Sequence, residues 1–277
     1  GGERFLRIDT KVESTPGDIE GSPTWAGLRM TDGGGGLNLN KQTLDVTEEA
    51  NVTSQPNPVL ETFAPGGTLG LIPSPWDTGL DFDVSTGATK GALRFLLDWF
   101  FQRTNGALDS HSIELTDDNI LTQQYLGCKP NGFTIAISNG SFLTFSMDIL
   151  AMNGGRLGTA LDGSSDAPTF PAYRNWIIPN IIFQFGDKLT SSNDETTTRS
   201  TVTGVTITGT NNITPGAPRR FYPSSGDPNE DVRYGVAELR EGQLAIEGTI
   251  DVRLEDATWF DRYIEESGDR GSIRILG

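Results

Sequence analysis

Side chains that could carry out catalysis are few in this sequence. His111 is the only histidine, so any catalytic triad or histidine metal site would have to be built around it. Cys128 is the only cysteine, which rules out an intrachain disulfide or a cysteine metal cluster and favours a buried, unreactive thiol. The motifs of a nucleophile elbow, a zinc helix, a phosphate-binding loop and a calcium loop do not occur in the chain. We therefore expect no enzyme activity, no cofactor and no metal ion.

Pairs of acidic residues are the remaining candidates for chemistry. Asp81 with Asp83, or Glu247 with Asp251, could in principle serve glycoside hydrolysis, which uses two carboxylates. Residues two or four apart share one face of an extended strand, however. A solvated strand face is the simpler interpretation of both pairs.

The stretch 240–267 predicts a strand that runs directly into a short helix. Apolar and polar residues alternate over 244–255, which is the pattern of a half-buried strand. The expected buried face comprises Leu244, Ile246, Ile250, Val252 and Leu254. The expected polar face comprises Glu247, Thr249, Asp251, Arg253 and Glu255. The helix is expected over 257–267, where one apolar stripe contains Trp259, Phe260 and Tyr263.

An earlier helix is predicted over 91–103, after a short alternating strand at 80–84. It is apolar on most sides, and its aromatic residues Phe95, Trp99 and Phe100 are expected in the core or against another subunit. The chain is expected to be mainly β outside these two helices.

Turn signals divide the rest of the chain into strands. The Asn-Gly step at 139–140 joins two alternating runs, 133–137 and 143–149, which predicts a β-hairpin. A separate strand is expected at 123–128. The four glycines 33–36 predict a flexible loop or hinge.

Two long stretches, 48–67 and 211–233, contain several prolines and show no clear period. They predict polar arms outside the core, of the kind that a partner orders. We expect these arms to bridge neighbouring subunits.

The order of elements occurs twice, which predicts an internal duplication. In each copy a strand is followed by an arm, a second strand, a helix and a third strand, at a nearly constant offset of about 160 residues. The first copy spans 43–47, 48–67, 80–84, 91–103 and 112–115. The second spans 204–208, 211–233, 244–254, 257–267 and 272–276. With a boundary in the Gly-, Ser- and Pro-rich stretch 153–171, the repeats are 1–158 and 159–277.

The charge balance argues against a protein that binds duplex nucleic acid. The chain has 37 acidic and 21 basic residues and a net charge of -16. This balance argues against a duplex-binding surface, which needs clustered Lys and Arg. The excess of acids fits either an ordinary solvated surface or a protein of a high-salt environment, and melting in molar salt distinguishes the two. No apolar run is long enough to span a bilayer, so we expect neither a membrane anchor nor a signal peptide.

Two segments resemble a known family. Residues 125–137 read Tyr-Leu-Gly-Cys-Lys-Pro-Asn-Gly-Phe-Thr-Ile-Ala-Ile and lead into the hairpin, and 247–263 contain the strand that enters a helix. Together they resemble the tail tube proteins of long-tailed, non-contractile, siphovirus-like viruses. The acidic, lysine-poor composition suggests a haloarchaeal tailed virus as the source.

The resemblance implies a structural virion protein located in the tail. Its fold would be two tandem β-sandwich or barrel units, each with one flanking helix and a long arm. Single-copy family members form hexameric rings, so a duplicated chain would form a trimeric, pseudo-hexameric ring. The rings would stack into a tube that conducts viral DNA during ejection. Further implied partners are the tail terminator, distal tail and tape-measure proteins.

The acidic bias has a physical role under this interpretation. Carboxylates on the lumen repel phosphates, so DNA passes without binding. The residues expected to line the lumen are Asp81, Asp83, Glu247, Asp251 and Glu255. The strand count and the lack of catalytic motifs also allow an alternative, a secreted or cell-surface β-sandwich binding module. Self-assembly into rings or tubes distinguishes the two.

Overall fold

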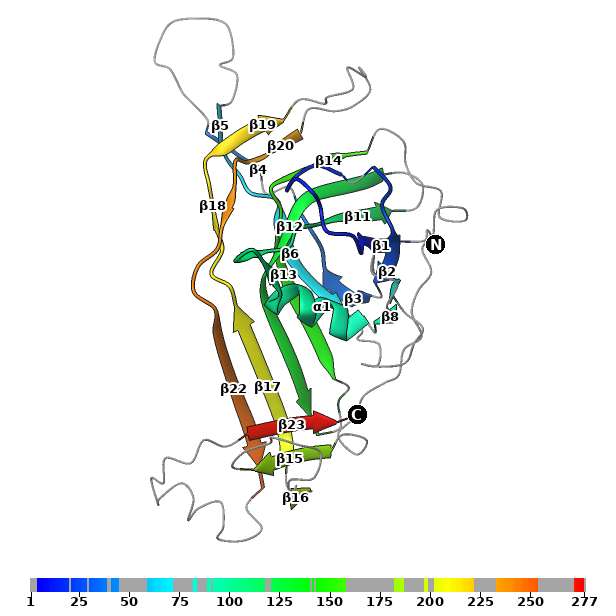
Figure 1. Ribbon diagram of the computed structural model, residues 1–277, viewed down its shortest axis with the longest axis vertical. Coiled ribbons are helices and arrows are strands. Elements are labelled where there is room, and N and C mark those ends of the chain that lie inside the picture. Colours follow the sequence, from blue (N-terminus) through cyan, green and yellow to red (C-terminus); the bar gives the residue numbers. More distant parts are fainter. Residues whose placement is uncertain are drawn as a thin grey trace, which may run out of the picture.

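The computed structural model describes most of the β-rich body of the 277-residue chain (Figure 1). The described residues are 4–19, 21–28, 30–38, 41–44, 59–71, 82–83, 89–90, 92–117, 121–139, 141, 143–157, 182–186, 197–198, 202–221, 233–253 and 272–276. The predicted mainly β fold is confirmed, with one helix, α1 (Ala92–Phe101), in this part of the chain. No described helix has the length and apolar composition required to cross a bilayer.

Twelve strands form one large antiparallel sheet that folds into two layers. Layer 1 runs in the order β19 (Pro218–Phe221), β20 (Arg233–Val236), β14 (Asn153–Arg156), β12 (Leu121–Ser138), β11 (His111–Asp117), β1 (Arg4–Asp9) and β2 (Trp25–Leu28). Layer 2 runs in the order β3 (Met30–Gly35), β6 (Gly66–Leu71), β13 (Thr144–Leu150), β12, β17 (Val202–Thr210) and β22 (Ala245–Val252).

Five small sheets complete the described strands. They are β4 (Lys41–Leu44) with β5 (Val59–Phe63), β7 (Phe82–Asp83) with β8 (Thr89–Lys90), β9 (Arg103–Thr104) with β10 (Ala107–Leu108), β18 (Thr214–Pro215) with β21 (Leu239–Arg240), and β15 (Ile182–Gly186) with β16 (Thr197–Thr198) and β23 (Ser272–Leu276).

Strand β12 belongs to both layers. Its first half pairs with β11 and β14 in layer 1, and its second half pairs with β13 and β17 in layer 2. The separate strands expected at 123–128 and 133–137 are therefore one strand, and the expectation of a break was wrong. The chain changes layer at Gly127, whose φ is 66°, and at a bulge between Pro130 and Gly132, because such features let a strand bend without ending.

The hydrophobic core lies between the two layers and α1. Layer 1 contributes residues such as Leu6, Ile8 and Ile113, and layer 2 contributes residues such as Leu69, Phe145 and Met147. The helix predicted at 91–103 is confirmed, and Phe95, Trp99 and Phe100 are each at most 5% exposed. All three pack inside the chain itself, and Phe100 meets Phe133 of β12 edge to face.

The hairpin predicted across 139–140 is also confirmed. Phe133 pairs with Met147 and Ile135 with Phe145, so β12 and β13 present apolar residues to α1 in matched register. This register places the intervening polar residues on the opposite side of layer 2.

The stretch 211–233 is not an irregular arm throughout, as the sequence had suggested. Residues 202–221 and 233–253 are the two antiparallel legs of one bent ribbon, paired through β17–β22, then β18–β21, then β19–β20 (Figure 1). Backbone hydrogen bonds between these sheets, such as Ala237 N–H to Ala217 O, make the pairing nearly continuous. The sequence missed this ribbon because each leg gains its hydrogen bonds from a partner distant in sequence.

The prediction of a first arm at 48–67 was also only partly correct. Residues 59–63 form β5 and 66–67 begin β6, whereas 48–58 lie outside the described residues. The β4–β5 hairpin contacts β19 and β20, so the described parts of both predicted arms lie together at one end of the molecule (Figure 1).

One further expectation about a loop was wrong. Gly33, Gly34 and Gly35 belong to strand β3 rather than to a hinge, and an irregularity between Met30 and Gly35 accommodates them opposite Leu69 and Leu71 of β6. Residues 153–156 of the expected boundary form β14, which pairs with both β12 and β20.

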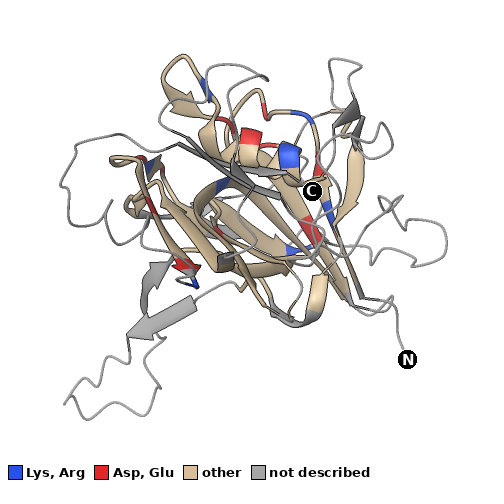
Figure 2. Ribbon diagram, turned by 90° about the horizontal axis from the view of Figure 1, so that it is seen from below, with Lys and Arg blue, Asp and Glu red and all other residues tan. Residues whose placement is uncertain are grey.

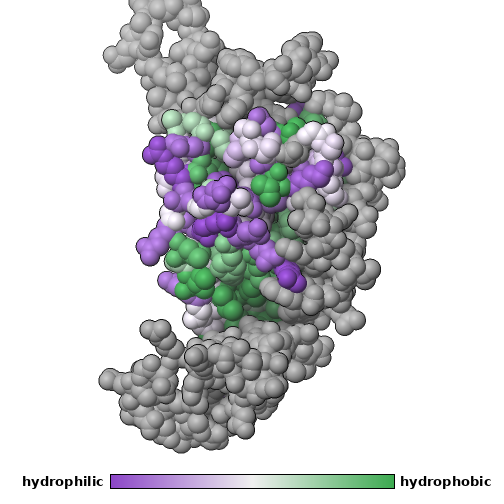
Figure 3. Space-filling model, viewed as in Figure 1, coloured by the Kyte–Doolittle hydropathy of each residue, from purple (hydrophilic) through white to green (hydrophobic). Residues whose placement is uncertain are grey.

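Strand β22 confirms the strand predicted at 244–254, and Leu244 packs against the core as expected, but the expected burial of Ile246 was wrong. Ile246 is 53% exposed, because β22 is at the edge of layer 2 and α1 covers β12 rather than β22. Apolar side chains are visible over the lower part of the ribbon in Figure 3.

The duplication remains a prediction. Strands from both proposed repeats, 1–158 and 159–277, hydrogen-bond within the same two-layer sheet. The second helix, with Trp259, Phe260 and Tyr263, lies outside the described residues.

A glycine substitution tests the pairing of β14 with β20. A Cβ on Gly235 would lie 1.8 Å from the carbonyl oxygen of Met152, whereas a Cβ on Gly21 would meet nothing within 4 Å. We expect Gly235→Ala to lower the free energy of unfolding by about 3 kcal/mol, the upper end of typical overpacking costs, and Gly21→Ala to have little effect. Thermal unfolding measures both, and a wild-type melting temperature for Gly235→Ala would contradict the described pairing.

Candidate functional site

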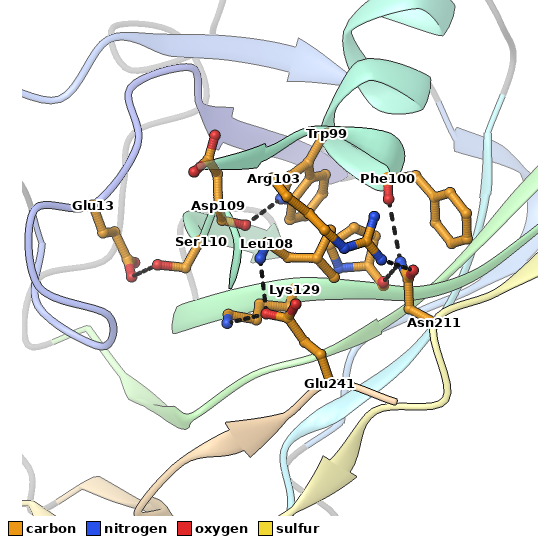
Figure 4. A network of polar contacts seen from close by, with 11 residues as sticks. Glu13, Trp99, Phe100, Arg103, Leu108, Asp109, Ser110, Lys129, Asn211 and Glu241 are labelled. Atoms are coloured by element: carbon orange, nitrogen blue, oxygen red, sulfur yellow. Dashed lines mark hydrogen bonds and ion pairs between the residues drawn. The ribbon is translucent and has the colours of Figure 1, made fainter. Parts of the chain in front are cut away.

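Glu13 is the most connected buried acid in the described fold. Its carboxylate accepts hydrogen bonds from the backbone N–H groups of Gly17 and Gly127 and from the hydroxyls of Ser110 and Ser112, at 2.7–3.0 Å. Burial raises the pKa of the Glu13 carboxyl, and these four donors oppose the shift. Because every contact belongs to the chain itself, Glu13 fastens the loop after β1 onto layer 1 (Figure 4).

His111 and Cys128 face each other across β11 and β12, and both are buried. His111 Nδ1 lies 2.8 Å from the carbonyl oxygen of Asp9, and its ring packs edge-on against Phe95 and Trp99. Burial raises the pKa of the Cys128 thiol well above its ordinary value, which disfavours the reactive thiolate. The arrangement is that of a packed core, and the described residues contain no group of three side chains suited to a metal ion.

The solvent-facing side of layer 2 is the most distinctive surface. Directly paired residues of antiparallel strands share a face, so the registers of β12, β13, β17 and β22 assign its members. We call it the threonine–acid face: Thr134, Thr144, Ser146, Asp148, Thr206, Thr208, Thr210, Glu247, Thr249 and Asp251. All of these side chains are at least partly exposed.

Three carboxylates stand on the threonine–acid face. Glu247 lies opposite Thr208, and Asp251 lies over Gly204, where a Cβ would be 2.7 Å from Asp251 Oδ2. Asp148 accepts a hydrogen bond of 2.8 Å from Asn131 Nδ2, which fixes its position near the end of β13.

The sequence had nominated Glu247 and Asp251, and the structure brings them onto one exposed face. It had missed Asp148, although the alternation of polar and apolar residues over 143–149 contained the signal. Asp83 is in β7, which pairs with β8 outside layer 2. Asp81 and Glu255 lie outside the described residues.

Basic residues are absent from the threonine–acid face within the described strands. Strands β3, β6, β13, β17 and β22 contain neither Lys nor Arg, and the one lysine of β12, Lys129, is 7% exposed and paired with Glu241 at 2.7 Å. Elsewhere the basic residues are scattered along the described ribbon (Figure 2). Within these strands the face therefore carries only negative charge, and the exposed Arg253, which follows Asp251 in the alternation, lies just beyond the end of β22.

The buried histidine predicts a pH dependence of stability. Burial lowers the pKa of His111 to about 4 from an ordinary value of 6.5, while the Asp9 carbonyl and the Asp109 charge oppose the shift. The neutral imidazole is therefore favoured in the folded state, and its contribution is fully present above pH 6.5 and lost as the pH falls from 6.5 towards 4. The loss amounts to about 3 kcal/mol.

His111→Phe provides the comparison, because an aromatic ring fits between Phe95 and Trp99. The difference in unfolding free energy between wild type and variant is expected to change by about 3 kcal/mol between pH 7 and pH 4. Glu13, whose raised pKa acts in the opposite direction, is present in both proteins and cancels. Parallel pH profiles for the two proteins would show that His111 is not buried in its neutral form.

Comparison with known proteins assigns the chain to a structural family. A search of curated proteins finds no match to the chain. A family model described as phage tail tube protein matches residues 11–275, nearly the whole chain and all four strands of the threonine–acid face. The chain belongs to the phage tail tube protein family and is a self-assembling structural component of the virion tail.

Proposed function

We propose that this chain is the major subunit of a long, non-contractile tail tube and that the threonine–acid face lines its lumen. The observation that supports this proposal is the composition of that face, which presents hydroxyls and three carboxylates and no exposed basic residue within its four strands. Such a wall repels phosphates and offers DNA no cation to bind along these strands, so viral DNA passes during ejection without adhering.

The edge of layer 2 supports ring formation. In the described part of the chain β22 pairs only with β17, and its other edge presents backbone N–H and C=O groups over eight residues. An edge of this length that lacks Lys and Pro is a template for pairing with another chain. Pairing of β22 with a different edge of the next subunit is heterologous, and heterologous contacts form a ring when the rotation between subunits closes.

The exposed apolar residue Ile246 lies beside that edge, on the side of layer 2 opposite the lumen. Burial of Ile246 against a neighbouring subunit would explain why the predicted apolar face of this strand is uncovered in the single chain. The arms, whose described parts converge at one end of the molecule, would contact the next ring.

The number of chains in a ring depends on how many tube-forming units each chain contains. One unit per chain would require six chains for a sixfold ring, whereas two fused units would require three. The described strands of both halves share one two-layer sheet, which favours six. We therefore propose a hexamer, with the trimer of duplicated chains as the competing arrangement.

Imaging and mass measurement test the assembly. We expect purified protein to form rings and tubes in negative stain, and isolated rings to have a mass of about 180 kDa for six chains of 29.9 kDa each. A mass of half that value would establish the trimer. Uniform monomeric particles under all conditions of salt and concentration would refute a tube-forming subunit.

Charge reversal tests the lumen assignment. We expect Glu247→Lys with Asp251→Lys to leave ring formation intact and to make the tubes retain short duplex DNA at low salt, with retention lost as salt rises. Glu238→Lys with Asp18→Lys is the matched control, since both are exposed acids outside the threonine–acid face. Equal DNA retention by the two variants, measured by co-sedimentation, would show that this face does not line the lumen.

A further inference from the structure

The bent ribbon connects the threonine–acid face to the end of the molecule where the arms converge. Its legs belong to layer 2 through β17 and β12, and to layer 1 through β20 and β14. The ribbon must therefore change direction between β17–β22 and β18–β21, and its regular strand pairing stops at 211–213 and 241–244. We call this interruption the joint.

The first leg is bonded at the joint to β12 and α1 rather than only to the other leg. The Asn211 side-chain amide donates to the carbonyl oxygens of Pro130 at 2.9 Å and Phe100 at 3.3 Å, and its oxygen accepts from Arg103 at 2.8 Å. The backbone N–H of Asn211 donates to the Asn131 carbonyl oxygen at 2.7 Å. Asn211 is fully buried (Figure 4).

The second leg is bonded to the same part of β12. Glu241 Oε1 lies 2.7 Å from Lys129 Nζ and accepts a hydrogen bond of 2.8 Å from the backbone N–H of Leu108. The side chains of this ion pair are 9% and 14% exposed. Both legs are thus attached to residues 129–131, where β12 itself passes from one layer to the other (Figure 4).

The backbone of the joint is also tightly constrained. Asn212 has a φ of 49°, which is uncommon for a residue other than glycine. A Cβ on Gly242 would lie 2.6 Å from the Asn212 carbonyl oxygen, so the legs approach as closely as only glycine permits. Gly242 N–H donates to the Asn211 carbonyl oxygen at 3.0 Å.

We propose that Lys129, Glu241 and Asn211 are positioning residues that set the angle between the wall-forming strands β17–β22 and the arm-bearing strands β19–β20. Buried ion pairs add little net stability compared with apolar residues of the same size, but they demand one geometry. The joint thereby fixes where the arms point relative to the lumen wall. This inference rests on the tube-forming role proposed above. In that role, the angle between the two pairs of strands determines how regularly one ring stacks on the next.

The substitution pair Lys129→Met with Glu241→Gln tests the joint. It removes the ion pair, while the Glu241→Gln change retains an acceptor oxygen for the Leu108 N–H. The matched control is Arg240→Met with Glu238→Gln, which removes an exposed ion pair from the same ribbon. Lys129→Arg, which keeps the charge pair, is expected to behave as wild type.

The angle is measured on the unassembled chain by spin labels at Ala217→Cys and Thr249→Cys, two exposed positions on opposite sides of the joint. Cys128 is fully buried and stays unlabelled. We expect a single narrow distance distribution for wild type and control, and a distribution at least twice as broad for the joint variant at an unchanged melting temperature. If that variant does not fold, Glu241→Asp, which shortens one side chain, is expected to shift the distance instead.

Imaging then links the joint to assembly. Joint-variant rings are expected to form normally but to give tubes several-fold shorter, or with an irregular ring spacing, compared with the control. Unchanged distance distributions for both joint variants would overturn the proposal. Failure of the wild type to form tubes would refute the proposed function and leave the distance measurement as an independent test of the joint.

Discussion

The passage of β12 from one layer to the other is the constraint on which the rest of the fold depends. At residues 129–131 it supplies the lysine, the backbone carbonyl oxygens and the asparagine that bind both legs of the bent ribbon. Lys129 and Glu241 form a buried ion pair. Removing one partner of a buried ion pair leaves the other charge without compensation, which typically costs about 3–5 kcal/mol of folding stability. Through Phe100 and Arg103 the same cluster also satisfies the carboxyl end of α1, so helix, ribbon and central strand are fastened at one place.

Local signals in the sequence identified the elements that depend on local interactions. The apolar run at 91–103 forms α1 because its side chains meet the core on several sides, and the Asn-Gly step joins β12 to β13 because the two runs alternate in compatible register. Elements completed by distant partners were missed or misread. The glycines of β3 are extended only because β6 pairs with them, and the described residues 211–221 contain strands because 233–240 lies beside them.

For the candidate site, too, the sequence predicted the features that depend on one strand and missed those that depend on pairing between strands. Alternation placed Glu247 and Asp251 on one face of a strand, and this is how β22 presents them. It could not reveal that Asp148, about a hundred residues earlier, stands on the same face, because that depends on the registers of β13 with β12, of β12 with β17 and of β17 with β22. Alternation also predicted burial of Ile246, which fails because burial requires a second layer above β22 and α1 does not extend there.

The chemistry of the threonine–acid face reconciles two demands that usually conflict. A wall made of strands needs residues of high β-propensity, most of which are apolar, whereas a wetted surface needs polar groups. Threonine meets both, since its branched Cβ favours strands and its hydroxyl binds water. In the described part of the chain no hydrogen bond to protein is made by the hydroxyls of Thr134, Thr206, Thr208, Thr210 or Thr249, which leaves them available to solvent.

The spacing of the carboxylates completes this argument. Glu247 and Asp251 are four residues apart on one strand, a separation of about 13 Å, and three strand spacings of about 4.8 Å separate either from the strand of Asp148. These separations exceed the screening length of about 8 Å at physiological salt, so the acids repel one another weakly and cost the fold little. A polyanion passing over the face meets at least one of them at any position, because its closely spaced phosphates cannot avoid every carboxylate at once. Sparse acids on a threonine surface therefore combine a stable sheet with a surface that repels polyanions, as the proposed lumen requires.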